Sequence, residues 1–166
     1  MERILIIGLQ GSGKSTFANK LGQRLNREVI HLDKIYYESG WKHTQTKEEW
    51  RQTIRNLVSD QRWIMDGQYN STLDIRIPAA DTIIFFNFSK TVCFYRIFKR
   101  IFNKVQPFDK AEGNFNKISW DLIKKILYFP RQETLAKLEP FKNSKKIFIV
   151  KNSREAKNLL DKLVIM

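Results

Sequence analysis

The feature that most constrains this chain is a short glycine-rich stretch between an apolar run and a helical pattern. The sequence GLQGSGKS, residues 8–15, fits the pattern G-x-x-x-x-G-K-[ST] at every fixed position, and Thr16 follows it. Glycines reach φ angles that other residues resist, and they let backbone N–H groups approach phosphate oxygens. A helix that starts near Gly13 would aim its N-terminal N–H groups and its dipole at the same anion. The stretch therefore predicts a phosphate-binding loop that holds a nucleotide.

Within this loop the residue types predict separate contacts. Lys14 supplies a mobile positive charge for the β- and γ-phosphates, and the Ser15 hydroxyl can ligate Mg²⁺. With glycine at about 7% of residues, the pattern would arise by chance in well under a few percent of chains of this length. The predicted nucleotide-binding residues are Gly8, Gly11, Ser12, Gly13, Lys14, Ser15 and Thr16.

Short apolar runs alternate with amphipathic patterns along the rest of the chain. The runs are rich in Ile, Val and Phe at consecutive positions, which indicates strands covered on both faces, as in a parallel sheet. The alternation predicts an α/β fold with right-handed crossovers. The 166 residues suit one domain, 1–166, because domains most often have about 100–150 residues. The predicted strands are Arg3–Gly8, Glu28–Asp33, Arg62–Gly67, Asp81–Phe88 and Lys145–Val150.

Acidic residues end two of the predicted strands. A nucleotide site of this kind needs a carboxylate near Mg²⁺, at the carboxyl end of a neighbouring strand, where ligands bind in open α/β sheets. Asp66 and Asp33 both meet this requirement, whereas the strand that ends near Asn87 offers no acid. The alternative for each acid is an ordinary cap or turn residue. We favour a functional role for both because of the glycine loop.

Residues 103–117, NKVQPFDKAEGNFNK, have no sustained apolar period and form a predicted lid, since long irregular segments in compact domains are often functional. Arg96 and Arg100 lie four apart on the helix predicted before it, and such side chains stabilise the charge of a phosphoryl group in transfer. A solvated basic face is the alternative for this pair. Arg76 and Arg131, each near a proline, are weaker candidates that could equally be surface charges.

Other side chains carry less information. His31 is interpreted as packed within the second strand, and Cys93 as a packing residue of a helix. Four aromatic residues could line an acceptor pocket next to the two acids, or could be ordinary core or surface residues. They are Tyr36, Tyr37, Trp41 and Tyr69.

The bulk composition limits the partners. The formal charge of +13 implies a polyanionic binding partner, such as nucleic acid, a membrane surface or a phosphorylated small molecule. A single cysteine excludes an internal disulfide and a cysteine-cluster metal site, which favours a cytoplasmic setting. No apolar run approaches the roughly 18–20 residues of a membrane span, and the N-terminus lacks the cleavage-type ending of a signal peptide. No helix-turn-helix, zinc finger or RNA-binding signature is present, so nucleic-acid binding is expected to be non-specific at most.

The motifs in their order resemble the bacterial DNA topology modulation proteins, which are relatives of adenylate kinase among the P-loop kinases. The resemblance runs from residue 1 to about residue 100 and is weaker beyond it. It is carried by "GLQGSGKSTFANKL", "HLD", "WIMDGQY" and the R-x-x-x-R of "CFYRIFKR". It implies a three-layer P-loop NTPase fold, with a five-stranded parallel sheet of order 2-3-1-4-5, helices on both faces, and a lid.

The resemblance also implies roles for single residues. Asp66 matches the acid of the Asp-Gly segment that helps to hold Mg²⁺ in adenylate kinases. Arg96 and Arg100 match two arginines at the lid entry, of which the first stacks on adenine and the second reaches phosphate. Asp33 matches an acid that related kinases place beside the acceptor. The chain departs from the pattern at "QYN", which replaces the "FPR" of adenylate kinases and argues against AMP as acceptor. Its lid also lacks the arginine and cysteine of many relatives.

Three functions follow as hypotheses. The favoured one is a Mg²⁺-dependent kinase with ATP as phosphoryl donor and a nucleotide or other small molecule as acceptor, in which Asp33 binds the acceptor or acts as general base. The second is a nucleic-acid-binding protein that modulates DNA topology. The third is a nucleotide switch or ATPase without a dedicated acceptor. The sequence leaves the acceptor and the oligomeric state open.

Overall fold

The computed structural model describes residues 1–37, 45–103 and 120–165. Its centre is one five-stranded sheet in which every pairing is parallel and the strand order is β2-β3-β1-β4-β5. This confirms the predicted sheet and its order. The strands are β1 (Arg3–Gly8), β2 (Val29–His31), β3 (Trp63–Asp66), β4 (Thr82–Phe86) and β5 (Lys146–Val150).

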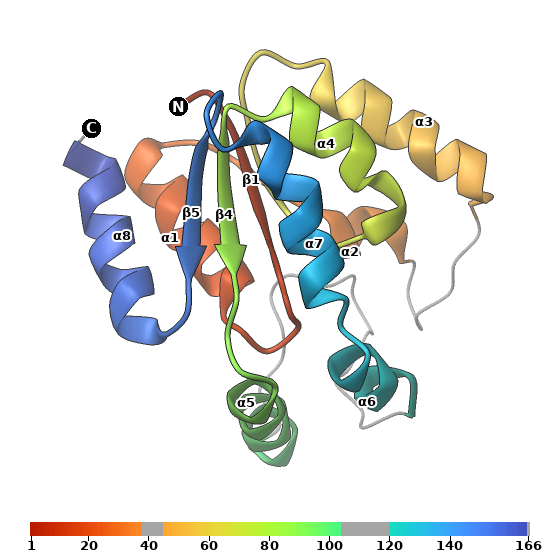
Figure 1. The fold of residues 1–166 in the computed structure, drawn as a ribbon, viewed down its shortest axis with the longest axis vertical. Helices are drawn as coiled ribbons and strands as arrows, with labels where there is room; N and C mark the ends of the chain where they lie inside the picture. The colour runs from red at the N-terminus through yellow and green to blue at the C-terminus, as the bar shows by residue number, and fades with distance from the viewer. Residues whose placement is uncertain (38–44, 104–119, 166) are drawn as a thin grey trace.

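Helices cover both faces of the sheet, which gives three layers (Figure 1). One face carries α1 (Lys14–Leu25) and α8 (Ser153–Ile165), which pack side by side. The other face carries α3 (Lys47–Val58), α4 (Leu73–Ala79) and α7 (Arg131–Leu138). Two short 3₁₀ turns, η2 (Asn70–Thr72) and η3 (Glu139–Phe141), connect these helices to their neighbours.

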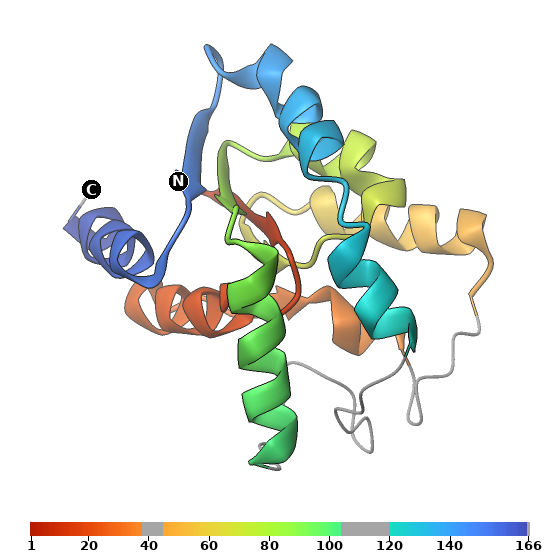
Figure 2. The same ribbon diagram turned by 60° about the horizontal axis from the view of Figure 1, so that its bottom comes forward.

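The remaining helices gather at the carboxyl edge of the sheet, to which the arrowheads in Figure 1 point. They are α2 (Leu32–Tyr36), α5 (Lys90–Phe102) and α6 (Trp120–Leu127). Figure 2 brings this edge forward and shows α5 projecting from the body of the protein. The loop between β1 and α1 lies at the same edge, so the fold brings the glycine-rich stretch and the strand-end residues together.

The buried core explains the consecutive apolar runs. β3 and β4 are buried at every position and β1 at all but its first, because each has a strand on both sides and helices on both faces. The edge strands β2 and β5 are only partly buried. Continuous apolar strands of this kind are typical of parallel sheets.

Helix starts follow local capping chemistry. At the start of α8 the Asn152 side chain accepts a hydrogen bond from the backbone N–H of Glu155 at 2.9 Å. The Glu155 carboxylate in turn accepts from the backbone N–H of Lys151 at 2.7 Å. Thr46 and Glu49 form a reciprocal capping box at the start of α3.

The second strand differs from its prediction. β2 ends at His31, which pairs in register with Asp66 at the end of β3. The chain then turns directly into α2, so Asp33 lies in the first turn of this helix and does not end a strand. Except for Asn103, the predicted lid at 103–117 lies outside the described residues. None of the helices in the described ranges is long and apolar enough to cross a membrane.

Candidate active site

The glycine loop uses backbone conformations that favour glycine. Gly8, Gly11 and Gly13 have φ angles of +144°, +79° and +93°. A Cβ atom on Gly8 would lie 2.6 Å from the backbone oxygen of Phe86, and one on Gly11 would lie 2.6 Å from that of Cys93. The loop is therefore pressed between the end of β4 and α5, and side chains at these two positions would not fit.

The N-terminus of α1 opens into this loop. Its first helical hydrogen bond runs from the N–H of Phe17 to the carbonyl of Gly13, so the N–H groups before Phe17 have no acceptor within the helix. Gly13 at the N-cap has no side chain to satisfy them, and none of the first-turn residues, all of them described, is acidic. A helix end of this kind attracts an anion through its N–H groups and its dipole.

Asp66 lies where the motif requires a carboxylate. Its side chain is 4% exposed, and Oδ1 lies 4.0 Å from Nζ of Lys14. Among the described residues, Oδ1 has no hydrogen-bond partner. A buried carboxylate oxygen without a donor fits the oxygen ligands that Mg²⁺ takes in nucleotide sites, and the hydroxyl of Ser15, in the first turn of α1, is a second such oxygen. Asp66 and Ser15 are thus the residues that could hold the metal.

The other oxygen of Asp66 is held by a histidine that sequence reasoning treated only as a packing residue. Nδ1 of His31 lies 3.0 Å from Asp66 Oδ2, and Nε2 lies 2.7 Å from Oδ1 of Asn19 on α1. His31 and Asp66 are both 7% exposed or less. The available signal was that both residues were predicted near the ends of strands that proved to be neighbours in the sheet.

Asp33 lies beside a cluster of aromatic side chains and is hydrogen-bonded to one of them. Its Oδ1 accepts a hydrogen bond from the Tyr69 hydroxyl at 2.6 Å. The ring of Tyr69 lies 4.8 Å from that of Tyr36 and 5.2 Å from that of Trp50. Burial, together with the adjacent Asp33 carboxylate, strongly raises the pKa of Tyr69, so its hydroxyl keeps its proton and remains a donor. Tyr36, Tyr37 and Tyr69 therefore gather beside Asp33, whereas Trp41 lies outside the described residues.

Arg76 is not a surface charge. Its side chain is fully buried and donates to the carbonyl oxygens of Gly67, Gln68 and Tyr69 at 2.6–2.7 Å. Its Nε donates to the Thr72 hydroxyl at 3.1 Å. Burial lowers the pKa of Arg76, although a guanidinium stays charged at neutral pH. One buried cation thus fixes the segment that follows Asp66, including Tyr69 at its unusual φ of +28°.

Gln68 connects that segment to the phosphate loop. Its Oε1 accepts a hydrogen bond from the backbone N–H of Gly8 at 2.8 Å, and its Nε2 donates to Thr134 on α7 at 3.2 Å. This is one of the positions at which the chain departs from the adenylate kinase pattern. The departure has a structural use here, because an amide can accept from the loop and donate to α7 at once.

Arg96 of α5 lies against the same loop. Arg96 donates to the Ser12 carbonyl at 2.9 Å and to the Ser153 hydroxyl at 2.6 Å, and its guanidinium lies 4.9 Å from the ring centre of Phe88. Arg100 follows one turn later and is half-buried. Arg131, at the start of α7, is also half-buried and donates to the Phe88 carbonyl at 2.6 Å. It is therefore not an ordinary surface charge.

Cys93 is a packing residue, as predicted. It is fully buried in α5, and burial raises the pKa of its thiol to about 11. Within the described ranges, no three side chains of His, Cys, Asp or Glu cluster into a metal site. A metal at the edge of the sheet would therefore depend on Asp66 and Ser15 together with ligand phosphates and water.

Comparison with known proteins identifies the fold. No protein-family model matches the chain, and no curated protein matches it. Among solved structures, the chain is similar to a deoxyadenosine kinase from M. mycoides with bound dCTP, at 15% identity over 98% of this chain and 99% of that one, with a TM-score of 0.51. A sugar kinase from Janibacter sp. HTCC2649 shares 14% identity over 99% and 93% of the two chains, with a TM-score of 0.55. A gluconokinase from Sinorhizobium meliloti 1021 shares 17% over 99% and 94%, with a TM-score of 0.51.

These likenesses show the three-layer P-loop α/β fold, which confirms the predicted fold class. At such low identity they extend to the fold alone. The DNA topology modulation family is not among these matches, so that resemblance stays a prediction.

Proposed function

We propose that residues 1–166 form a single P-loop kinase domain that transfers a phosphoryl group from Mg-ATP to a hydroxyl of a small molecule or nucleotide. The observation that carries the proposal is the juxtaposition of three groups at one edge of the sheet. The uncapped N-terminus of α1 and the amine of Lys14 would bind phosphates, and the buried Asp66 Oδ1 faces that amine at 4.0 Å. The three solved structures described above are named as kinases, which supports this assignment.

The donor nucleotide would bind along the glycine loop. The N–H groups before Phe17 and the charge of Lys14 neutralise its phosphates. Mg²⁺ in this position would neutralise charge that builds up on the phosphates, and Asp66 and Ser15 are the residues that would hold it. ATP is thus the proposed phosphoryl donor and Mg²⁺ the proposed cofactor.

Arg96 is suited to the base rather than to the moving phosphoryl group. Both of its terminal nitrogens already donate to Ser12 and Ser153, and these bonds fix the plane of the guanidinium. One face of this plane packs on Phe88, and the opposite face would stack on a purine. Arg100, one turn further along α5, is then the arginine proposed to reach the phosphates.

The acceptor would bind beside Asp33. Tyr69 occupies Oδ1 of this carboxylate, which leaves Oδ2 to take the proton from an acceptor hydroxyl. The acceptor oxygen then bonds to the γ-phosphorus and ADP leaves. Tyr37 and Lys125 of α6, whose amine donates to the Tyr37 hydroxyl at 3.4 Å, border this side of the site. The proposed lid at 103–117 lies in the chain between α5 and α6.

The first test is nucleotide binding, measured by calorimetry with ADP and Mg²⁺. Lys14→Ala should reduce ADP affinity strongly because the main side-chain cation at the phosphates is lost. Lys20→Ala, an exposed lysine on the same helix, is the matched control and should bind like the wild type. Full-strength binding by Lys14→Ala would show that the site is wrongly assigned.

The second test is transfer, measured as ADP release from ATP with a panel of nucleosides, sugars and other hydroxyl compounds. For an active acceptor, Asp33→Asn should lower kcat by about 10²–10⁴-fold, the range of general base catalysis, while ADP binding is kept. Asp60→Asn, an exposed acid beyond α3, serves as the control. Basal hydrolysis that no compound stimulates would favour a nucleotide switch or ATPase instead.

A further inference from the structure

A chain of three polar side chains runs from α1 to the end of β3, behind the phosphate loop. Asn19 contacts His31 at 2.7 Å, and His31 contacts Asp66 at 3.0 Å. His31 and Asp66 are buried, and Asn19 is half-buried. None of the functions proposed above uses Asn19 or His31. Burying polar groups destabilises the folded state unless they are hydrogen-bonded, so we expect these buried contacts to have a role.

The donors and acceptors of this chain can be assigned. An ionised carboxylate only accepts, so the contact with Asp66 requires a proton on Nδ1 of His31. If the amide nitrogen of Asn19 faces Nε2, a neutral ring meets this requirement. If the amide oxygen faces Nε2, both ring nitrogens donate. In either arrangement Nδ1–H points at Oδ2 of Asp66.

We propose that His31, oriented by Asn19, is the positioning residue for Asp66 and sets the affinity of the nucleotide site for its divalent cation. The inference rests on the proposed function, because it takes Asp66 as the metal carboxylate. With Oδ2 bound by the ring, Oδ1 is the oxygen directed at Lys14 and the phosphate loop. A carboxylate held at one oxygen cannot rotate the other away from the site.

The fold builds this arrangement from two rigid elements. His31 and Asp66 are register partners at the ends of adjacent parallel strands, so their side chains leave the same face of the sheet. Ser15 and Asn19 lie four residues apart on α1, which packs on that face. The helix therefore carries one candidate metal ligand and the group that orients the histidine, and the sheet carries the other ligand and the histidine itself.

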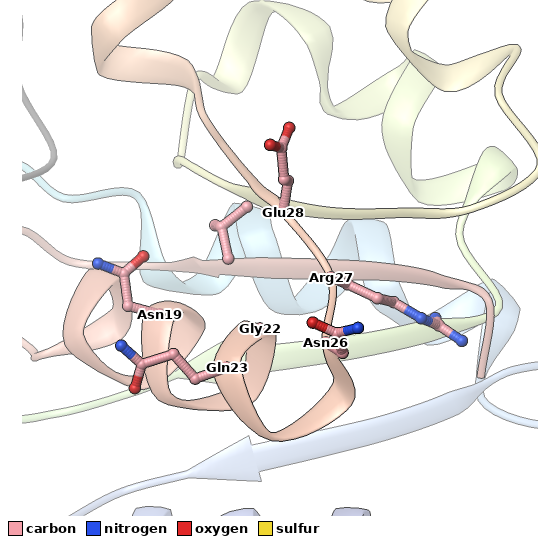
Figure 3. Close-up of a pocket in the computed structure, with 7 residues that line it drawn as sticks. Asn19, Gly22, Gln23, Asn26, Arg27 and Glu28 are labelled. Carbon is pink, nitrogen blue, oxygen red and sulfur yellow. The ribbon is translucent and has the colours of Figure 1, made fainter.

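Asn19, at the outer end of these side-chain contacts, is a suitable position for substitution. Asn19 lies at the rim of a hollow of about 430 Å³, and Gln23 lies one turn further along α1 at the same hollow (Figure 3). Gln23 is exposed and is not part of the chain of contacts to Asp66. It provides a matched control on the same helix face.

The experiment compares two amides at position 31. His31→Asn places an amide nitrogen near the position of Nδ1, so it can still donate to Asp66. His31→Gln places its amide near the position of Nε2, so it keeps the contact with Asn19 and loses the one with Asp66. ADP affinity is measured by calorimetry with Mg²⁺ and with EDTA, and Mn²⁺ binding to the ADP complex is measured by electron paramagnetic resonance.

The positioning role predicts that substitution of His31 lowers the affinity for the metal and leaves the metal-free affinity for the nucleotide unchanged. His31→Gln should weaken Mn²⁺ binding and the Mg²⁺ enhancement of ADP affinity by about 10–100-fold, as outer-shell substitutions do at other metal sites. ADP affinity in EDTA should stay at the wild-type value. His31→Asn should restore most of the loss, Asn19→Ala should show a smaller loss than His31→Gln, and Gln23→Ala should show none.

The contrary results distinguish a failure of the positioning role from a failure of the proposed function. Equal metal affinity in wild type and His31→Gln would overturn the positioning role and leave the kinase proposal intact, as would an equal loss of ADP affinity with and without metal. A wild-type protein that binds no ADP would instead overturn the proposed function and this inference with it. Should His31→Gln fail to fold by circular dichroism, Asn19→Ala carries the test, since alanine is well tolerated in a helix. Unchanged Mn²⁺ binding in that variant would then refute the proposal.

Discussion

Replacing Arg76 by methionine should destabilise the protein more than any surface substitution. The guanidinium makes four hydrogen bonds, three of them to successive backbone carbonyls. Bonds to a charged group contribute about 1.5–3 kcal/mol each, which sets an upper limit of roughly 6–12 kcal/mol. Burial of the charge offsets several kcal/mol of this. Arg76→Met leaves three carbonyls without this donor, at about 1–3 kcal/mol each, and removes the cost of burying the charge. We therefore expect it to lower the free energy of unfolding by about 3–5 kcal/mol.

The assay is urea unfolding followed by tryptophan fluorescence, since Trp50 and Trp63 are buried in the core. Native domains have about 5–15 kcal/mol of stability, so a loss of this size leaves a folded variant over most of that range. Its midpoint temperature should fall by roughly 6–20 °C. Arg76→Lys keeps the charge but loses the planar fork of donors, so it should lie between wild type and Arg76→Met.

Arg55→Met is the matched control. Arg55 pairs with Glu48 on the exposed side of α3, where its side chain is 42% exposed. Exposed pairs of this kind contribute little to stability because water and salt screen them. If Arg76→Met were no less stable than this control, the carbonyls of residues 67–69 would not need the buried cation, and the reasoning would be refuted.

Three further predictions concern the loop, the thiol and acid stability. Gly11→Ala and Gly13→Ala should both introduce strain of about 1–2 kcal/mol, because both residues have a positive φ. A Cβ on Gly11 would lie 2.6 Å from a backbone oxygen, whereas a Cβ on Gly13 would lie 3.6 Å from its nearest neighbour, a side-chain atom. Gly11→Ala should therefore be less stable by a further 1–3 kcal/mol or so in urea, and equal stabilities would contradict the stated contact. Because burial raises the pKa of Cys93 to about 11, a disulfide reagent at pH 8 should label the unfolded chain quickly and the native protein hardly at all. Burial pushes the pKa of Asp81 up, yet hydrogen bonds from the first backbone N–H groups of β1 and its neighbour outweigh this and lower it. Its contribution to stability is thus present above about pH 4 and lost as the pH falls through the lowered pKa, so Asp81→Asn should flatten the acid side of the stability profile.

The sheet could be predicted from sequence because its signal is local. Each buried strand is a continuous apolar run, and the glycine motif fixes the end of β1, whose bounds agree with the prediction. The second strand was predicted too long because the apolar pattern continues through Leu32. β2 ends because the chain turns into α2 directly after its last register pair with β3. The local sequence does not show where this pairing between strands stops.

The inner contacts of the site could not be predicted in this way. Arg76 follows Leu73 at i+3 and precedes Ile77, so it falls on the apolar stripe of α4, which was the one available sign of its burial. Its partners are backbone carbonyls, and every residue has one, so no residue type marks them. The pairing of His31 with Asp66 likewise depends on the register of β2 against β3, which the strand order alone does not fix, and the two residues are 35 positions apart in the chain.

The contacts around the glycine loop imply a preorganised site. Gln68 binds the N–H of Gly8, Arg96 binds the carbonyl of Ser12, and Gly11 rests against α5. Ordering a backbone residue costs about 1–2 kcal/mol, and here that cost is met during folding rather than at the moment of binding. An anion that enters the loop would find its donors already in place. Its association rate would then be governed by diffusion and by the positive charge of the protein, and not by a rearrangement of the loop.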